Sequence, residues 1–351
     1  MRPSAKTNSS IALAITMSTF VGVLLSCSVT RPPTPASPEP AAARFPAVAP
    51  PLADVANAYV LAGQRALPVR KGEDVHGLHN LFQLSANVWS GSEPDGEAAF
   101  EELARLGVKT AISVDGKRPD AELAAKHGLR YVHVPIEYKG LTDEELLQLA
   151  KTFRECEPPF YLHCFHGRHR GPAAAAVGRL VLDGAAREQV IAEMRQWCGT
   201  ASDYEGLFRD LVLKPMPTAD ASRDYVFDFP AQRSFGGFRE AMVDAARRHD
   251  ALKKLEKRDF AIDPAHPDID ALESAKQLAD TFAISGTLAE IFDRPADFHG
   301  WMEVSKVETV ALRDALQRLR GGDATALAPA RRAYAAMTKA CIDCHQQYRN
   351  H

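Results

Sequence analysis

The positions of apolar and polar residues divide the chain into a part that alternates and a part that is purely helical. From about Leu78, apolar runs of strand length alternate with amphipathic stretches at helical spacing. Strands that alternate with helices favour a parallel sheet flanked by helices. The predicted strands are Asn87–Ser90, Val108–Val114, Leu129–Ile136 and Phe160–His163, and the predicted helices begin at Asp95, Pro119, Thr142 and Ala173.

The second part of the pattern begins after a break. The stretch Lys214–Arg233 contains three prolines and loses the periodicity, so we place a domain boundary there. Beyond it, apolar residues recur only at helical spacing, and short breaks that hold Pro or Gly separate four segments. Four helices with short connections predict an antiparallel four-helix bundle. The segments are Phe238–Lys257, Asp270–Phe292, Val304–Leu319 and Ala324–Tyr348.

The N-terminus has the pattern of a secreted lipoprotein. Arg2 and Lys6 precede an apolar run at 11–25, and the residues that end at Cys27 have the form of a lipobox. The run has the size of a signal peptide and is short for a membrane anchor, which is the alternative. Cleavage before Cys27 would leave a lipidated cysteine. This predicts a protein anchored to a membrane outside the cytoplasm, in the periplasm or cell envelope.

Length and composition agree with two folded domains after this leader. The Pro- and Ala-rich stretch that follows it offers few residues for a core and is typical of an extended linker. A net charge of −3 gives no indication of a nucleic-acid partner. The predicted organisation is a signal peptide at 1–27, a linker and lead-in at 28–75, an α/β domain at 76–214, a linker at 215–232 and a helical bundle at 233–351.

A C-x-x-C-H motif, made of Cys341, Cys344 and His345, stands almost at the end of the chain. This is the attachment site of a c-type haem, in which both thiols form thioethers and the histidine ligates iron. A redox or zinc C-x-x-C that happens to precede a histidine is the alternative, but no second cysteine pair lies nearby to complete a zinc site. With Tyr348 and Arg349 on the same helix, the motif resembles the cytochrome c-prime/cytochrome c556 family. The resemblance implies one covalent haem c inside the bundle, with Arg349 near a propionate.

The resemblance also concerns the second protein ligand of the haem iron. It implies a sixth position opposite the first helix of the bundle, where Met242 is our candidate ligand and His249 the rival. Core packing for Met242 and solvent exposure for His249 are the plain alternatives. A sixth ligand implies electron transfer with a redox partner, whereas an open position implies binding of a small gas. Bundles of this kind also pair, so a homodimer stays open.

An H-C-x5-R motif lies between a predicted strand and a predicted helix. Successive backbone N–H groups that end at a helix N-terminus form a cradle for a phosphate dianion. Gly167 allows a backbone conformation that a side chain would hinder, Arg170 offers a planar fork to two phosphate oxygens, and the same N–H groups favour a nucleophilic thiolate at Cys164. The motif comprises His163, Cys164, Phe165, His166, Gly167, Arg168, His169 and Arg170.

This loop resembles the phosphate loop of the protein-tyrosine and dual-specificity phosphatases. The resemblance implies hydrolysis of phosphate monoesters through a phosphocysteine intermediate, with Cys164 as nucleophile and Arg170 as phosphate ligand. Two features depart from the family. Gly171 stands where a Ser or Thr usually assists the second step, and the loop that usually carries an acidic Asp has none. Glu137 and Asp143 are the candidates for the acid, and Asp115 is a more distant one.

Three histidines crowd this loop. The resemblance implies that His163 orders the loop. His166 and His169 add positive potential near an anion, especially below neutral pH, and a metal cluster is the alternative. Two further cysteines, Cys156 and Cys198, could pair with each other, or Cys156 could pair with Cys164. The alternative is that both are small buried side chains.

Two functions follow from the sequence. The first is a membrane-tethered phosphatase joined to a haem module, which acts on a phosphorylated substrate of unknown class. The second is a haem electron carrier or gas-binding protein whose phosphatase-like domain binds only an anion or a partner. The intact Cys164 and Arg170 favour the first, and the departures at Gly171 and in the acid loop favour the second.

Overall fold

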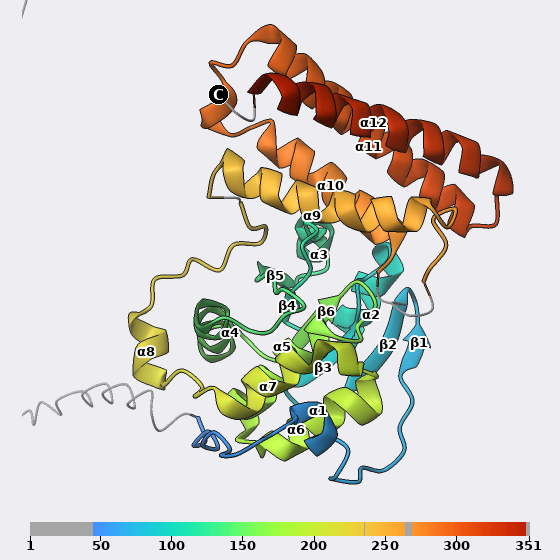
Figure 1. The fold of residues 1–351 in the computed structure, drawn as a ribbon. Coiled ribbons are helices and arrows are strands. Elements are labelled where there is room, and N and C mark those ends of the chain that lie inside the picture. Colours follow the sequence, from blue (N-terminus) through green and yellow to red (C-terminus); the bar gives the residue numbers. More distant parts are fainter. Residues whose placement is uncertain (1–44, 235, 264–268, 349–351) are drawn as a thin grey trace, which may run out of the picture. The chain divides into compact units, whose positions relative to one another are not determined.

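A six-stranded sheet organises the first part of the chain, with strand order β1-β2-β3-β6-β4-β5 (Figure 1). β3, β6, β4 and β5 are parallel, as predicted, whereas β1–β2 and β2–β3 are antiparallel, so the sheet is mixed. Two antiparallel pairs thus extend the predicted parallel strands at one edge, because strands joined by short turns pair antiparallel. The strands are β1 (Glu73–Val75), β2 (Leu78–Gln83), β3 (Val88–Ser92), β4 (Thr110–Ser113), β5 (Arg130–His133) and β6 (Phe160–Cys164).

The structure, a computed structural model, describes residues 45–234, 236–263 and 269–348. The predicted signal peptide and the lipobox at Cys27 lie outside the described residues, as does Arg349. Within the described ranges, no helix is long and apolar enough to cross a membrane.

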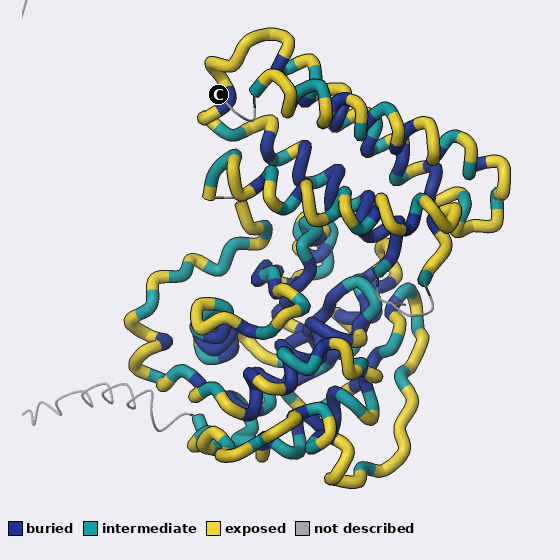
Figure 2. Tube along the Cα trace, in the orientation of Figure 1, coloured by how far each residue is buried: buried dark blue, intermediate teal, exposed yellow. Residues whose placement is uncertain are grey.

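Both faces of the sheet are buried, because successive side chains on a strand point to opposite faces. Ile112, Val132 and Leu162 belong to one apolar cluster, and their neighbours Ala111, Tyr131 and Tyr161 belong to another. Figure 2 shows the buried central strands. The first cluster includes residues of α4 (Asp143–Glu155), α5 (Arg170–Asp183), α6 (Arg187–Glu193) and α7 (Glu205–Leu213), and the second those of α2 (Glu97–Arg105) and α3 (Ala121–Lys126).

Local sequence explains where these helices begin and end. Thr142 and Glu145 form the predicted capping box at the start of α4. Gly184 ends α5 in a left-handed conformation, which glycine adopts without a steric penalty. No pattern in the sequence predicted α1 (Ala58–Leu61), β1 or α8 (Ala219–Asp224), which lie in segments interpreted as linkers. These elements are only three to six residues long, too short for a periodic pattern.

The second part of the chain consists of four long helices with an apolar cluster of their own. α10 ends seven residues before the predicted Phe292, at Ser285, and a short 3₁₀ turn follows it. α11 begins eight residues before the predicted Val304, because Gly300 and His299 interrupt its apolar pattern without breaking the helix. The helices are α9 (Phe238–Glu256), α10 (Ala271–Ser285), α11 (Ala296–Arg320) and α12 (Leu327–Tyr348).

We expect Leu162→Ala to lower the free energy of unfolding by about 2–5 kcal/mol, because it leaves a cavity beneath the central strand. Leu162 is fully buried in β6. Urea unfolding followed by tryptophan fluorescence measures the change. Leu213→Ala, at an exposed leucine, is the matched control. Equal losses in the two variants would contradict this account of the core.

Candidate active site

The loop between β6 and α5 has the backbone geometry of an anion cradle. β6 ends at Cys164 and α5 begins at Arg170, so the intervening residues turn at the N-terminus of a helix. Gly167 has a φ of 67°, and a Cβ there would lie 2.2 Å from the carbonyl carbon of Gly91. Only glycine fits this position, as the motif predicted.

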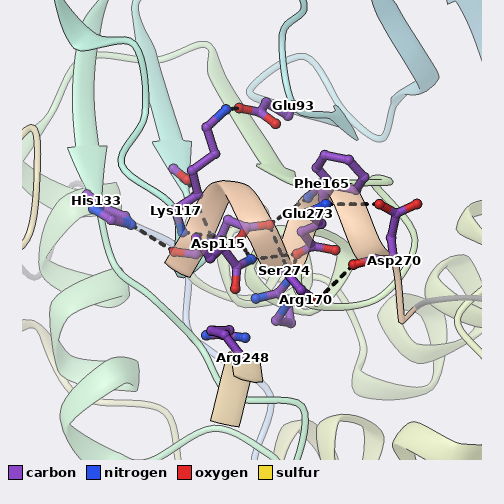
Figure 3. A network of polar contacts seen from close by, with 12 residues as sticks. Glu93, Asp115, Lys117, His133, Phe165, Arg170, Arg248, Asp270, Glu273 and Ser274 are labelled. Carbon is purple, nitrogen blue, oxygen red and sulfur yellow. Dashed lines mark hydrogen bonds and ion pairs between the residues drawn. The ribbon is translucent and has the colours of Figure 1, made fainter. Parts of the chain in front are cut away.

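Arg170 lies at the centre of a buried polar network (Figure 3). Its side chain is 1 % exposed, and Nη2 donates to Asp115 Oδ2 at 3.1 Å and to Glu273 Oε1 at 2.9 Å. The ring of Tyr138 lies under the guanidinium, at 4.2 Å from Cζ to the ring centroid. Nε of Arg170 is buried with no hydrogen-bond partner among the described residues. An unpartnered buried donor beside loop amides is what an anion would satisfy.

The pKa values of the two carboxyl groups that contact Arg170 shift in opposite directions. Burial opposes ionisation of Asp115, but the guanidinium groups of Arg170 and Arg248 outweigh it, and the pKa of Asp115 falls below its ordinary value. Burial, reinforced by the charge on Asp115, raises the pKa of Glu273 well above its ordinary value. The network therefore favours the ionised form of Asp115 and the protonated form of Glu273.

Asp115 also occupies part of the loop. Its Oδ2 accepts a hydrogen bond of 2.8 Å from the backbone N–H of Phe165, the residue after the predicted nucleophile. The side chain of Gln277 on α10 donates to Oδ1 of Asp115 and, at 2.7 Å, to Glu273. Because it is ionised and already engaged, Asp115 does not serve as the proton donor that the sequence left open.

The loop histidines are neutral and not a source of positive charge. His163 Nε2 lies 2.6 Å from the hydroxyl of Tyr131, and burial lowers the pKa of His163 to about 3. Burial also lowers the pKa of His169 to about 3 and that of His166 below its ordinary value. The expected positive potential was wrong, because burial of imidazole disfavours its charged form. Within the described ranges, these histidines form no metal-ligand cluster.

The predicted acids are engaged elsewhere. Glu137 Oε1 accepts from Arg247 of α9 at 2.5 Å and lines a different cavity, of about 330 Å³. Asp143, in the first turn of α4, has an 89 % exposed side chain and accepts from Lys214 at 3.0 Å. Neither contact involves the loop.

Gly171 packs against the loop, where a Cβ would lie 3.1 Å from the backbone nitrogen of Cys164. A side chain at this position would need the loop to shift.

A polar cleft of about 960 Å³ adjoins the loop. Phe165, His166 and Arg168 line it from the loop, and Lys276 and Arg320 line it from α10 and α11. Both of these cations lie over the ring of Phe165, at 5.5 and 5.6 Å from its centroid. The cleft is therefore built by both parts of the chain.

Sequence reasoning missed Tyr138, Glu273 and Gln277. Glu273 is 103 residues from Arg170, so no local spacing links them. Glu273 and Gln277 are four residues apart on one helix, and two polar residues at this spacing are typical of a solvent-exposed helix face. Only the folded chain shows that this face is buried.

The C-x-x-C-H residues line a second, mostly apolar cavity of about 330 Å³ between α9, α10, α11 and α12. Cys341, Cys344 and His345 contribute to it from α12, and Met242 and His249 from α9. His249 Nε2 lies 2.9 Å from Thr338 Oγ1 and its ring stacks on Tyr334, so the histidine is not simply solvent-exposed. Burial raises the pKa of both thiols, and all cysteines in the described ranges are free.

The donor set fits a haem c. Two thiols and an imidazole from one helix face an apolar cavity, with a thioether and a second imidazole on α9. The same residues Met242, Cys344 and His345 also line an adjoining cavity of about 440 Å³. Neither candidate for the sixth ligand is favoured by the cavity, since both line it.

Comparisons with known proteins relate the chain to a dual-specificity phosphatase. No family model matches it. A stretch of 119 residues is 29% identical to the dual specificity protein phosphatase TpbA of one Pseudomonas aeruginosa strain, covering 33% of this chain and 54% of TpbA. TpbA of a second strain is 28% identical over 118 residues. The chain thus spans about half the length of the curated relatives it matches.

Solved structures of TpbA also match part of the chain. A crystal structure of P. aeruginosa TpbA is 25% identical with a TM-score of 0.32, covering 42% of this chain and 85% of that chain. TpbA in complex with pTyr is 24% identical with a TM-score of 0.32, covering 38% and 80%. The N-terminal half is therefore similar in sequence to TpbA. The resemblance of the bundle to cytochrome c-prime stays a prediction.

We expect Gly167→Ala to destabilise the protein more than Gly107→Ala. Both glycines have positive φ, 67° and 81°, so each alanine costs about 1–2 kcal/mol for backbone conformation. A Cβ at Gly107 meets nothing within 4 Å, whereas one at Gly167 meets the backbone of Gly91. The difference in the free energy of unfolding between the two variants isolates this clash. A difference of zero would mean that the loop does not hold the described conformation.

Proposed function

We propose that the α/β part is a cysteine-dependent phosphatase domain that hydrolyses phosphate monoesters through a phosphocysteine. The observation that supports this most is the buried Arg170, whose Nε has no partner among the described residues, beside a loop that only Gly167 allows. The similarity to TpbA supports the same reaction class. The substrate is a phosphorylated molecule of unspecified class.

Each residue has a defined part in the first step. The Cys164 thiolate attacks phosphorus, the S–P bond forms, and the P–O bond to the leaving group breaks with its electron pair on that oxygen. The loop N–H groups and Arg170 stabilise the charge on the remaining phosphate oxygens. In the second step, water attacks phosphorus, the S–P bond breaks, and inorganic phosphate leaves.

The second step has less assistance than the first. Gly171 supplies no hydroxyl, and Glu137 and Asp143 are engaged with Arg247 and Lys214. A leaving group of low pKa, such as nitrophenolate, needs no proton, so the first step can still proceed. We infer that the phosphocysteine accumulates. The same contacts favour the second candidate function, in which the domain binds only an anion or a partner.

Turnover of para-nitrophenyl phosphate separates the two functions. We expect a rapid burst of nitrophenolate followed by a slow steady rate. Cys164→Ser should abolish both, with a loss of roughly 1,000-fold or more, as for removal of a covalent nucleophile. Cys156→Ser, at a buried cysteine outside the loop, is the matched control and should behave as wild type. Wild-type turnover no greater than that of Cys164→Ser would leave only the binding function.

We further propose that Cys341 and Cys344 would hold one haem c covalently and that His345 would ligate its iron. The apolar cavity they line supports this assignment. When bound, the haem supplies either one-electron transfer or a site for a small gas. The protein residues around it exclude water and set which of these is possible, since Met242 and His249 line the same cavity. Haem attachment agrees with the proposed anchorage at Cys27, outside the cytoplasm.

Optical spectra of protein made in a host that attaches haem c test this proposal. We expect haem to stay with the chain after denaturation, and to be lost in a Cys341→Ala, Cys344→Ala double variant but kept in Cys156→Ser. If Met242 is the sixth ligand, reduced wild type binds carbon monoxide weakly and Met242→Ala binds it readily. Ready binding by wild type would rule out a tight Met242 ligand, and absence of covalent haem would refute the site.

A further inference from the structure

Helix α10 of the helical part reaches into the phosphate loop of the α/β part. Its N-cap residue Asp270, which is 1 % exposed, accepts a 2.9 Å hydrogen bond from the backbone N–H of Glu273 and pairs with Arg320 of α11. Glu273 then accepts from Arg170, and Gln277, one turn later, donates to Glu273 and Asp115. The cap and the helix period thus fix where the carboxyl of Glu273 lies (Figure 3).

These contacts engage the groups that a substrate phosphate would need. Arg170 donates hydrogen bonds to two carboxyl groups, and the backbone N–H of Phe165 donates one to Asp115. Cys164 is only 3 % exposed. Among the described residues, Phe165 lines the adjoining cleft, whereas Cys164 and Arg170 do not. A substrate in the cleft therefore reaches the rim of the loop and not the nucleophile.

We propose that α10 holds the protein in a self-inhibited state, in which the carboxyl group of Glu273 takes the place of the substrate phosphate on Arg170. A phosphate monoester binds by displacing Glu273. This inference rests on the proposed phosphatase function, since it concerns access to the same loop.

The exchange is favourable because of charge. Burial favours the neutral form of Glu273, and a neutral carboxyl group is a weaker acceptor for Arg170 than a phosphate dianion. The guanidinium is charged in both states, but only the dianion adds direct attraction between opposite charges in this buried site. Glu273 that leaves the network and reaches water can ionise, which further favours its release at neutral pH.

The packing also permits the displacement. The apolar cluster of the bundle contains no residue of the α/β part, and the two clusters of the sheet contain none of the bundle. Hydrogen bonds between the two parts include one from Arg247 to Glu137. Another runs from the backbone N–H of Arg118 to Asp280, at 3.0 Å. Release of α10 therefore breaks polar contacts and leaves each apolar core intact, as in interfaces between mobile domains.

Steady-state kinetics of the full-length chain with para-nitrophenyl phosphate test the inference. An internal ligand that competes with substrate raises KM and leaves kcat unchanged. We expect Glu273→Ala to lower KM by roughly tenfold, the factor for one hydrogen bond to a charged group, and Gln277→Ala to lower it less. Glu303→Ala, at an exposed carboxylate of α11, is the matched control. A fall in kcat for Glu273→Ala would instead make Glu273 part of the catalytic machinery and overturn the proposal.

Binding of inorganic phosphate, measured by calorimetry, separates this inference from the proposed function. Glu273→Ala should bind phosphate roughly tenfold more tightly than wild type whether or not either protein turns over substrate. If neither protein has turnover but the affinity rises, the phosphatase function fails and the internal competition stands. An unchanged affinity in a variant that unfolds at the same urea concentration as wild type would overturn the inference.

Discussion

A buried guanidinium and the carboxyl groups around it determine how this protein is built. Removing an ion such as Arg170 from water costs of order several kcal/mol, unless oppositely charged and hydrogen-bonding partners surround it. Asp115 from the end of β4 and Glu273 from α10 are those partners, and the ring of Tyr138 covers the guanidinium. One cation thus connects the sheet, the loop and the helical part. The geometry of the loop and the access to it follow from this contact.

Helix α10 is shared by the two sites. Glu273 and Gln277 lie on the face that meets the loop, whereas Leu278 and Phe282 line the cavity beside the C-x-x-C-H residues. At 3.6 residues per turn, these pairs lie on opposite faces of the helix. The bundle cavity and the polar network of the loop therefore share one helix, although the two parts have separate apolar cores.

The sequence predicted features that depend on short spacing. The strand before Cys164, the helix after it, the glycine at 167 and the capping box at Thr142 all follow from residues close together in the chain. Features that depend on burial in the tertiary structure were not predicted, or were predicted wrongly. The histidines are neutral because the fold buries them, and Glu137 is engaged by a helix more than 100 residues away, at Arg247.

The contact on which the account depends could not have been predicted. Glu273 is an ordinary first-turn acid in the sequence, and nothing local marks it as buried or as a partner of Arg170. Glu273 and Arg170 are buried together only where α10 packs against the loop. The stability of this contact also depends on the hydrogen bonds of Asp115 and Gln277. Networks of this kind act as units, so single residues in a sequence give little indication of them.

The most direct measurement is a crystal structure of the Cys164→Ser protein with tungstate, an oxyanion of phosphate-like shape, bound at saturation. The account predicts the anion on the loop N–H groups and the Arg170 side chain, with Glu273 withdrawn from Arg170. An anion bound only at surface cations, with the Arg170–Glu273 contact unchanged, would contradict it.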